Sequence, residues 1–354
     1  MRILLCTDTF LPEVNGVTTV LTTMRDGLRQ RGHSVFVAAP DYGTPTADES
    51  DLRRLAAIPC PGYHQVRLSW PWGRGLSREF DRFAPDLVHV ITEGPLGLFG
   101  RGYARRRGLP LVSSFHTDFP RYAARYLGEF AVGPTRAWLR WFHGAALLTQ
   151  TPSGITCAEL HEMGIPRGTV WCRGVDAVWF HPSRRSSSRR AAMDAEGRVL
   201  VLHVGRLATE KGVDTLVAAF TLACERLGDR ARFCVAGDGP RTGLVRAALP
   251  FARHFGFLDR QTLADLYADS DIFVFPSPTE TCGLVALEAL ASGVPVIGAK
   301  AGGIPESLRQ GLTGFLVSAG DAQAFADRIV ELAEDAVQRG AMREAARAFA
   351  VGRD

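Results

Sequence analysis

Two glutamates separated by seven residues stand out in the second half of the chain. The segment Glu280-Thr-Cys-Gly-Leu-Val-Ala-Leu-Glu288 closely follows the apolar run Ile272–Pro276. That run predicts a strand, so we expect Glu280 in the loop at its carboxyl end, with a tight turn at Gly283 and a helix from Leu284. Unpaired N–H groups at a helix start bind anions, and a nearby carboxylate accepts hydrogen bonds from sugar or ribose hydroxyls. One glutamate alone would more simply be a solvated helix residue, but the strand–turn–helix context favours a ligand site.

A pair of cations follows another apolar run in the same half. Arg206 and Lys211 stand in the segment Gly-Arg-Leu-Ala-Thr-Glu-Lys-Gly, directly after Val199–Val204. Arginine offers a fork of N–H donors and lysine a compact charge, a combination that suits a diphosphate at the carboxyl end of a strand. The simpler alternative is a surface loop with ordinary charges. Their position immediately beyond a core strand favours the phosphate site.

The first half offers weaker candidates at two predicted strand ends. Asn15 and Gly16 precede the helix expected over Val17–Arg31, where a glycine lets the backbone approach a phosphate. Most such glycines merely turn the chain, so Gly16 alone predicts little. His116 and Asp118 follow another predicted strand and are placed to reach a cleft. A lone histidine is more often structural than catalytic.

Strands and helices alternate through both halves, which predicts an α/β fold of two Rossmann-like domains facing each other across a cleft. The expected strands are Arg2–Thr7, Ser34–Ala39, Leu87–Ile91, Leu109–Ser114, Leu147–Thr151, Val199–Val204, Arg232–Ala236, Ile272–Pro276, Val294–Ala299 and Gly314–Val317. Such alternation favours mostly parallel sheets with helices on both faces and ligands at the strands' carboxyl ends. The arginine- and serine-rich stretch 181–198 interrupts it. We therefore expect an N-terminal domain over 1–180, a linker over 181–198 and a C-terminal domain over 199–354, whose last helix crosses back or is truncated.

Composition excludes several classes of protein. The 354 residues are 46% hydrophobic and 22% charged, a globular balance, and a net charge of +4 requires no nucleic-acid partner. Seven cysteines without a C-x-x-C pair, and an N-terminus unlike a signal peptide, predict a cytoplasmic protein. Asp269 and Asp271 look like a metal-binding D-x-D pair. Because they precede a predicted strand, we expect them to end a helix and start that strand, and we expect no metal site.

Beyond these single features, the chain resembles the retaining glycosyltransferases of family 4, which have the GT-B architecture, over nearly its whole length. The matching segments are LPEVNGV, SFHTD, RGVDAVWFHP (Arg173–Pro182), VGRLATEKG, VAGDGP (Val235–Pro240), FGFL (Phe255–Leu258) and SPTETCGLVALEALASGVPVIGAKAGGIPE. Together they are highly specific, and the last is persuasive by itself.

The resemblance implies a role for each matching position. Arg206 and Lys211 correspond to the pair that grips the donor diphosphate. Glu288 corresponds to the ribose-binding glutamate, Glu280 to the one that holds hydroxyls of the transferred sugar, and His116 to the histidine near the leaving phosphate. On the donor side, the resemblance places Gly16 as closing from the other domain and puts Phe257 and Leu258 beside the base. The positions beside the phosphates are Cys282, Gly283, Leu284 and Val285. Asn15 and Asp118 are the acceptor-side candidates.

The resemblance also implies how the sugar is moved. Configuration is expected to be retained without a protein nucleophile, because the leaving phosphate oxygen accepts the acceptor's proton on the same face. The protein then positions the reactants and stabilises the departing diphosphate through Arg206, Lys211 and helix N–H groups. A covalent intermediate on Glu280 is the alternative. The resemblance implies no metal and no other cofactor.

The first segments of the chain point to a donor and an acceptor. LPEVNGV and SFHTDFPRY most resemble bacterial GDP-mannose-dependent α-mannosyltransferases and sulfoquinovosyl-transferring relatives. We expect mannose to pass from GDP-mannose to a lipid or glycan hydroxyl, with a UDP-sugar, glucosyl or sulfoquinovosyl, as the alternative donor. The segment Phe119–Phe142 interleaves aromatic residues with arginines. It suits either a helix on the anionic inner face of the cytoplasmic membrane or a domain-surface helix that buries Trp138, Leu139 and Phe142.

Three other functions share parts of this pattern. A nucleotide-binding dehydrogenase has the doubly wound fold, but no G-x-G-x-x-G follows the first predicted strand. A sugar-nucleotide epimerase has the two-domain architecture and differs in needing no acceptor. A catalytically silent sugar-nucleotide-binding module is the third, and the presence of Arg206, Lys211 and both glutamates argues against it.

Overall fold

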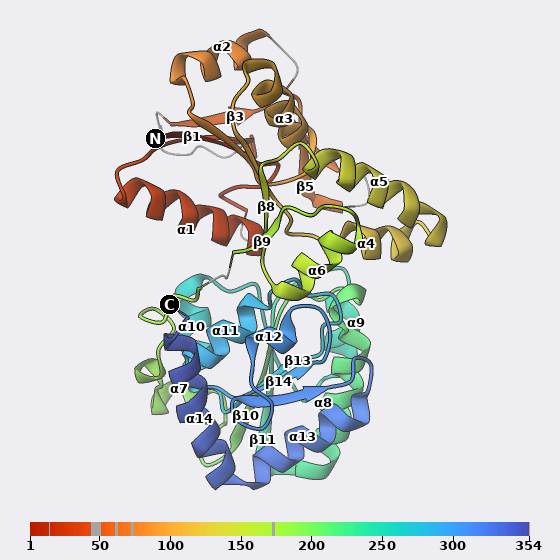
Figure 1. Ribbon diagram of the computed structural model, residues 1–354. Helices are drawn as coiled ribbons and strands as arrows, with labels where there is room; N and C mark the ends of the chain where they lie inside the picture. The colour runs from red at the N-terminus through yellow and green to blue at the C-terminus, as the bar shows by residue number, and fades with distance from the viewer. Residues whose placement is uncertain (14, 44–50, 61–62, 72–73, 172–173, 354) are drawn as a thin grey trace. The chain divides into compact units, whose positions relative to one another are not determined.

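The computed structural model describes residues 1–13, 15–43, 51–60, 63–71, 74–171 and 174–353. The chain divides into two compact units, Met1–Cys172 (unit 1) and Arg173–Asp354 (unit 2), so the division falls before the boundary expected at residue 180. Each unit is built on a parallel sheet flanked by helices (Figure 1). In the described part of the chain, no helix is both long and apolar enough to cross a membrane. The α/β fold expected from the sequence is confirmed.

Unit 1 contains a seven-stranded sheet in the order β3-β2-β1-β6-β7-β8-β9, with all neighbours parallel. Its strands are β1 (Arg2–Cys6), β2 (Ser34–Pro40), β3 (Leu52–Leu55), β6 (Leu87–Val90), β7 (Leu111–Ser114), β8 (Leu148–Thr151) and β9 (Gly168–Val170), and β4 (Ala57–Cys60) pairs separately with β5 (Tyr63–Ser69). Its helices are α1 (Gly16–Gln30), α2 (Arg74–Phe83), α3 (Pro95–Arg107), α4 (Phe119–Tyr126), η1 (Glu129–Ala131), α5 (Val132–His143) and α6 (Gly154–Glu162).

Alternating side chains of the central strand β1 belong to different parts of the unit 1 core. Leu4 and Cys6 join a cluster with Tyr103 of α3, whereas Ile3 and Leu5 join a second cluster with Leu21 of α1. Successive side chains of a strand point to opposite faces of the sheet, so a strand covered on both faces is apolar at every position. This is why the sequence of β1 reads as a continuous apolar run.

Unit 2 contains a six-stranded sheet in the order β12-β11-β10-β13-β14-β15, again all parallel. Its strands are β10 (Val199–Val204), β11 (Ala231–Ala236), β12 (Arg253–Gly256), β13 (Ile272–Phe275), β14 (Val296–Ala299) and β15 (Gly314–Val317). Its helices are η2 (Pro182–Arg184), α7 (Ser187–Ala192), η3 (Thr209–Lys211), α8 (Val213–Leu227), η4 (Gly228–Arg230), α9 (Thr242–Ala248), α10 (Arg260–Asp269), α11 (Leu284–Ala291), α12 (Ile304–Ser307), α13 (Ala322–Glu334) and α14 (Ala336–Val351). The last helix, α14, packs against α11 and α13 within this unit.

Residues 181–198, expected as a linker, fold instead as part of unit 2 and include η2 and α7. Arg185 donates to a carboxylate oxygen of Asp271 at 2.7 Å, and Arg189 donates to Asp269 at 2.6 Å. Both aspartates are buried, and buried carboxylates require cationic or hydrogen-bonding partners. The arginines of this stretch therefore fasten it to unit 2. Asp269 ends α10 and Asp271 directly precedes β13, as the sequence predicted.

Candidate active site

The strand order of unit 2 reverses between β10 and β13, which are neighbours in the sheet. At such a switch point the connections after the two strands leave in opposite directions, and a crevice opens at the strands' carboxyl ends. The loop after β10 carries Arg206 and Lys211, and the loop after β13 carries Glu280. The topology therefore brings together predicted site residues that lie 69 positions apart in the sequence.

Lys211 and Glu280 form an ion pair in which Nζ lies 2.5 Å from Oε1. Ser277 donates its hydroxyl to the same carboxylate oxygen at 3.0 Å. The Lys211 and Glu280 side chains are 21% and 16% exposed, so both remain accessible from solvent. A lysine ammonium has three N–H donors. Lys211 can therefore hold Glu280 and bind a phosphate oxygen at the same time.

Glycines allow the loops around this ion pair to approach each other closely. A Cβ added to Gly212, which has a φ of 71°, would lie 2.3 Å from the carbonyl oxygen of Pro276. A Cβ on Gly302, with a φ of 54°, would lie 2.1 Å from the carbonyl oxygen of Glu280. Gly303 donates its N–H to that same oxygen at 2.7 Å. Only glycine fits such close approaches at positive φ, and the backbone at Glu280 is consequently held in place.

Arg206 lies beside a buried carboxylate. Its Nη1 is 3.7 Å from Oε1 of Glu210, whose residue is only 2% exposed. The carbonyl oxygen of Glu210 accepts a hydrogen bond from Thr279 Oγ1 at 2.8 Å, which connects η3 to the loop after β13. The Arg206 side chain is 22% exposed. The guanidinium is thus oriented by Glu210 and still reachable by an anion.

The segment Cys282–Val285, which the sequence predicts to bind the donor, leads into α11, whose first residue is Leu284. Gly283, with a φ of 71°, precedes the helix and contributes no capping side chain. Ala286 donates its N–H to the carbonyl oxygen of Gly283 at 2.9 Å. The N–H groups of Leu284 and Val285, at the first two positions, have no acceptor within the helix and are suited to an anion. Cys282 is buried, and its carbonyl oxygen accepts a hydrogen bond from Ser307 at 2.6 Å.

Glu288 lies one turn into α11 and is partly buried. Its Oε2 accepts a hydrogen bond from the hydroxyl of Tyr267 in α10 at 3.2 Å. Burial raises the pKa of the Glu288 carboxyl to about 7, while the Tyr267 hydroxyl and the charge of Arg260 act in the opposite direction. The sequence did not single out Tyr267, because its part in the site depends on how α10 packs against α11.

The two predicted base-side residues lie between β12 and α10. Phe257 is 65% exposed, whereas Leu258 packs partly against the core of unit 2. An exposed aromatic ring close to a candidate nucleotide site is available for stacking on a base. The structure thus leaves Phe257 free to contact a base and gives Leu258 a mainly structural place.

The unit 1 candidates lie at the ends of β1 and β7. Asn15 caps α1: its Oδ1 accepts the N–H groups of Val17 and Thr18, both at 3.0 Å, and Gly16 is the first residue of the helix. His116 and Asp118 follow β7. Asp118 accepts the N–H of Arg121 at 3.1 Å as the cap of α4. Asn15 and Asp118 therefore both have a structural role in addition to any contact with an acceptor.

Unit 1 also contains a row of buried, hydrogen-bonded polar side chains that the sequence did not indicate. His143 contacts Ser113 Oγ at 2.9 Å through Nδ1 and Glu93 Oε1 at 3.2 Å through Nε2. The order serine–histidine–glutamate is that of a hydrolytic triad. Ser113 is 0% exposed, however, and the other two side chains are also buried. This row therefore satisfies interior polar groups and is out of reach of a substrate.

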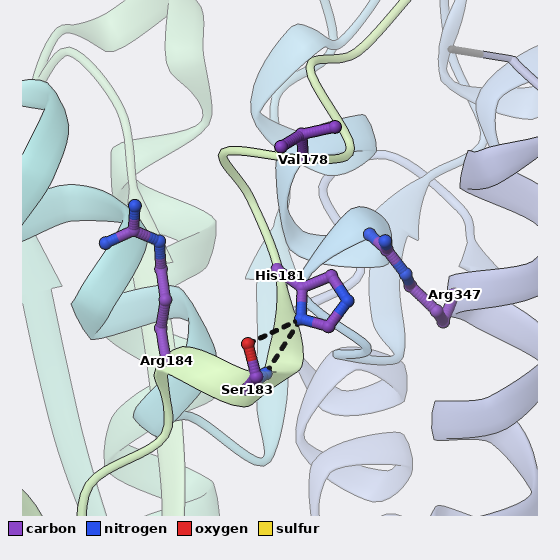
Figure 2. Close-up of a pocket in the computed structure, with 5 residues that line it drawn as sticks. All are labelled: Val178, His181, Ser183, Arg184 and Arg347. Atoms are coloured by element: carbon purple, nitrogen blue, oxygen red, sulfur yellow. Dashed lines mark hydrogen bonds between the residues drawn. The ribbon is translucent and has the colours of Figure 1, made fainter.

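In the part of the chain that the structure describes, no group of three or more His, Cys, Asp or Glu residues is placed to hold a metal ion. A pocket of about 520 Å³ in unit 2 is lined by Val178, His181, Ser183, Arg184 and Arg347 (Figure 2). Arg347 donates to the carbonyl oxygens of Ala177, Phe180 and Ala291, and Arg184 pairs with Asp265. These arginines hold the chain in place, and the pocket includes none of the predicted site residues.

Two family models and several known proteins match this chain. Residues 14–179 match the family model described as "Glycosyltransferase Family 4", and residues 198–335 match that described as "Glycosyl transferases group 1". A GDP-mannose-dependent alpha-mannosyltransferase of Mycobacterium tuberculosis is 35% identical over 100% of this chain and 93% of its own length. A sulfoquinovosyl transferase of Arabidopsis thaliana is 34% identical over 90% of this chain and 64% of its own length. Among solved structures, Anabaena HepE in complex with UDP-glucose aligns with a TM-score of 0.77 at 22% identity, covering 100% of this chain and 95% of its own.

Proposed function

We propose that this chain, a hexosyltransferase that belongs to glycosyltransferase family 4 and has the GT-B fold, transfers mannose from GDP-mannose to a hydroxyl of a lipid or glycan. The observation that carries the proposal is the ion pair between Lys211 and Glu280 at the switch point of unit 2. In this pair a cation suited to a diphosphate lies next to a carboxylate suited to sugar hydroxyls, which supports a site for a sugar linked to a diphosphate. The choice of donor rests on the 35% identical mannosyltransferase.

In the proposed reaction the bond between C1 of the sugar and the diphosphate oxygen breaks, and a bond from C1 to the acceptor oxygen forms on the same face. The acceptor's proton passes to the leaving phosphate oxygen, so the anomeric configuration is retained and no metal is needed. Arg206, Lys211 and the first-turn N–H groups of α11 stabilise the departing diphosphate. Glu280 fixes the orientation of the sugar through its hydroxyls.

We assign the acceptor side of the reaction to unit 1. We propose that His116, which follows β7, and Gly16, the first residue of α1, contribute to turnover of the donor. Asn15 and Asp118 contribute to the acceptor site while they cap α1 and α4. Replacing His116 by alanine should therefore lower turnover more than donor affinity.

A UDP-sugar is the competing donor. HepE was solved with UDP-glucose, and the Arabidopsis relative is a sulfoquinovosyl transferase. The exposed ring of Phe257 can stack on either base, because every base presents a π-face. The donor must therefore be established by direct competition between nucleotides.

We also propose that the enzyme works at the cytoplasmic face of a membrane as a peripheral protein. Leu139 and Phe142 are buried in unit 1, but Leu127 and Phe130 are 65% and 81% exposed. Arginines of α5, among them Arg136, are exposed close by in the sequence. Apolar side chains beside exposed cations suit an anionic lipid surface. Co-sedimentation with vesicles containing phosphatidylglycerol, but not with pure phosphatidylcholine vesicles, is the expected result.

The deciding experiment measures thermal unfolding with GDP, UDP, ADP and their common sugar conjugates in the presence of EDTA. A ligand that binds only the folded state raises Tm by mass action. Shifts with GDP and GDP-mannose support the proposal, and NMR of the transferred sugar then tests retention. If only UDP and UDP-sugars raise Tm, the donor is a UDP-sugar and not GDP-mannose. If no ligand shifts Tm, the result contradicts a nucleotide-sugar function and favours a protein that binds neither the nucleotides nor their sugar conjugates.

A further inference from the structure

We propose that Tyr267 is a positioning residue for the nucleoside: its hydroxyl holds one oxygen of the Glu288 carboxylate so that the other accepts the ribose hydroxyls. The inference rests on the proposed function and on the ribose-binding role that the family resemblance implies for Glu288. Tyr267 itself makes no contact with the ligand in this arrangement, and it acts only through Glu288.

Packing fixes the position of the Tyr267 hydroxyl. The ring is 0% exposed and makes edge contacts with Phe180 and Phe273, whose centroids lie 5.9 and 5.6 Å away. A buried tyrosine held by aromatic neighbours has little rotational freedom, and its hydroxyl needs a hydrogen-bond partner. The hydroxyl finds that partner in Glu288 Oε2 at 3.2 Å. The contact thus orients the carboxylate before any ligand binds.

The second carboxylate oxygen is left for a ligand. Glu288 is only partly buried, and its hydrogen bond to Tyr267 uses Oε2. An ionised carboxylate accepts hydrogen bonds at both oxygens, so Oε1 keeps its capacity to accept. Glu288 lies one turn beyond the first N–H groups of α11, the groups suited to phosphate. This spacing fits a ribose next to its own diphosphate.

The charge state of Glu288 depends closely on this hydrogen bond. Five elements pack on α11. Of these, β13 and β14 carry no titratable residue. The titratable residues of the other three are Arg260, Asp265, Tyr267 and Asp269 of α10, Glu306 of α12, and Arg339, Arg343, Glu344 and Arg347 of α14. Burial raises the pKa of Glu288 to about 7, and only Tyr267 and Arg260 counteract it. A donor hydroxyl that bonds the ionised form lowers that pKa. Removing the hydroxyl should therefore leave the carboxyl largely protonated at neutral pH.

The test is Tyr267→Phe, which removes one oxygen from a buried ring and keeps its packing. Tyr103→Phe is the matched control, because Tyr103 of α3 is also buried and donates to a carboxylate, that of Asp81, at 3.0 Å. Calorimetric titration of the full chain with GDP, from pH 6 to 8.5, should show about tenfold weaker binding in Tyr267→Phe at pH 7. The pH at which affinity falls to half should rise by about one unit. Tyr103→Phe should match the wild type.

A second readout isolates the ribose. The wild type should prefer GDP over 2′,3′-dideoxy-GDP by about tenfold, and Tyr267→Phe should lose most of that preference. An unchanged preference and pH profile in Tyr267→Phe would overturn the inference. Glu288→Gln separates this outcome from failure of the proposed function. If Glu288→Gln weakens GDP binding while Tyr267→Phe does not, only the role of Tyr267 is wrong. If Glu288→Gln binds GDP as tightly as the wild type does, the assignment of Glu288 to the ribose is wrong as well. If UDP alone binds the wild type, the same titrations are made with UDP and 2′,3′-dideoxy-UDP.

Discussion

Replacing Lys211 by alanine is the most direct test of the proposed donor site. The substitution removes the Nζ group that lies 2.5 Å from Glu280 Oε1. A charge-assisted hydrogen bond to a phosphate in a partly buried site contributes about 2–3 kcal/mol. At about 1.4 kcal/mol per factor of ten, its loss lowers kcat/KM for the sugar donor about 30- to 150-fold.

The same substitution should cost the fold much less. Glu280 keeps its hydrogen bond from Ser277, and its side chain is 16% exposed, so solvent can take over part of the lost interaction. We expect the free energy of unfolding to fall by about 1 kcal/mol. The loss of activity is then far larger than any loss of folded protein explains.

Initial-rate kinetics with the sugar donor and urea unfolding, measured on the same preparations, check both numbers. Arg226→Ala is the matched control: Arg226 pairs with Asp327 at 2.5 Å, and it lies at the far end of α8 from η3. That variant should keep kcat/KM within about twofold, because exposed ion pairs contribute little. A Lys211→Ala enzyme with the control's kcat/KM and donor affinity would refute the reasoning and place the diphosphate elsewhere.

Three further predictions concern other residues of the two units. Glu280→Ala should weaken calorimetric binding of GDP-mannose about tenfold more than binding of GDP, because the carboxylate holds the sugar; equal losses would contradict its role. Gly302→Ala should lower the free energy of unfolding by about 2 kcal/mol, because Gly302 has a positive φ and its added Cβ would lie 2.1 Å from a carbonyl oxygen. Gly340→Ala should raise it by about 0.5–1 kcal/mol, because an added Cβ on α14 meets open space. Urea titrations measure both changes. Burial raises the pKa of Asp8 to about 6, so the folded state binds the proton of this carboxyl more tightly than the unfolded chain does. The free energy of unfolding should therefore fall by about 3 kcal/mol as pH rises from about 4 to 6. Asp8→Asn should remove that decrease, and an identical slope in both proteins would argue against it.

The central strands could be predicted because burial on both faces leaves a continuous apolar run. The expected range of the central strand β10 coincides with the observed one, and so does that of β15, an edge strand whose residues are mostly buried. The edge strands β3, β9 and β12 were not predicted, since their residues are mostly half-buried or exposed. Where an edge strand is exposed in this way, its sequence lacks the continuous apolar run.

The same limit separates the predicted site residues from the missed ones. The placement of Arg206, Lys211 and Glu280 could be predicted because each follows a core strand, and ligands bind at the strand ends of an α/β fold. Tyr267 was not singled out because its contact with Glu288, 21 positions further along the chain, joins two helices. The arginines of 181–198 were misinterpreted for a similar reason, since their buried acidic partners lie about 80 positions further along the chain.

The close packing around Gly302 and Gly303 has a consequence for redesign of the enzyme's specificity. Added Cβ atoms there would lie 2.1 Å and 2.3 Å from the carbonyl oxygens of Glu280 and Thr281. The loops after β13 and β14 are thus interlocked through their main chains. Exchanging the 280–283 loop for that of a homologue with a different donor would introduce a backbone conformation that fits the homologue's own loop after β14. Changes of specificity should be sought by substituting side chains on the existing loop, or by transplanting both loops together.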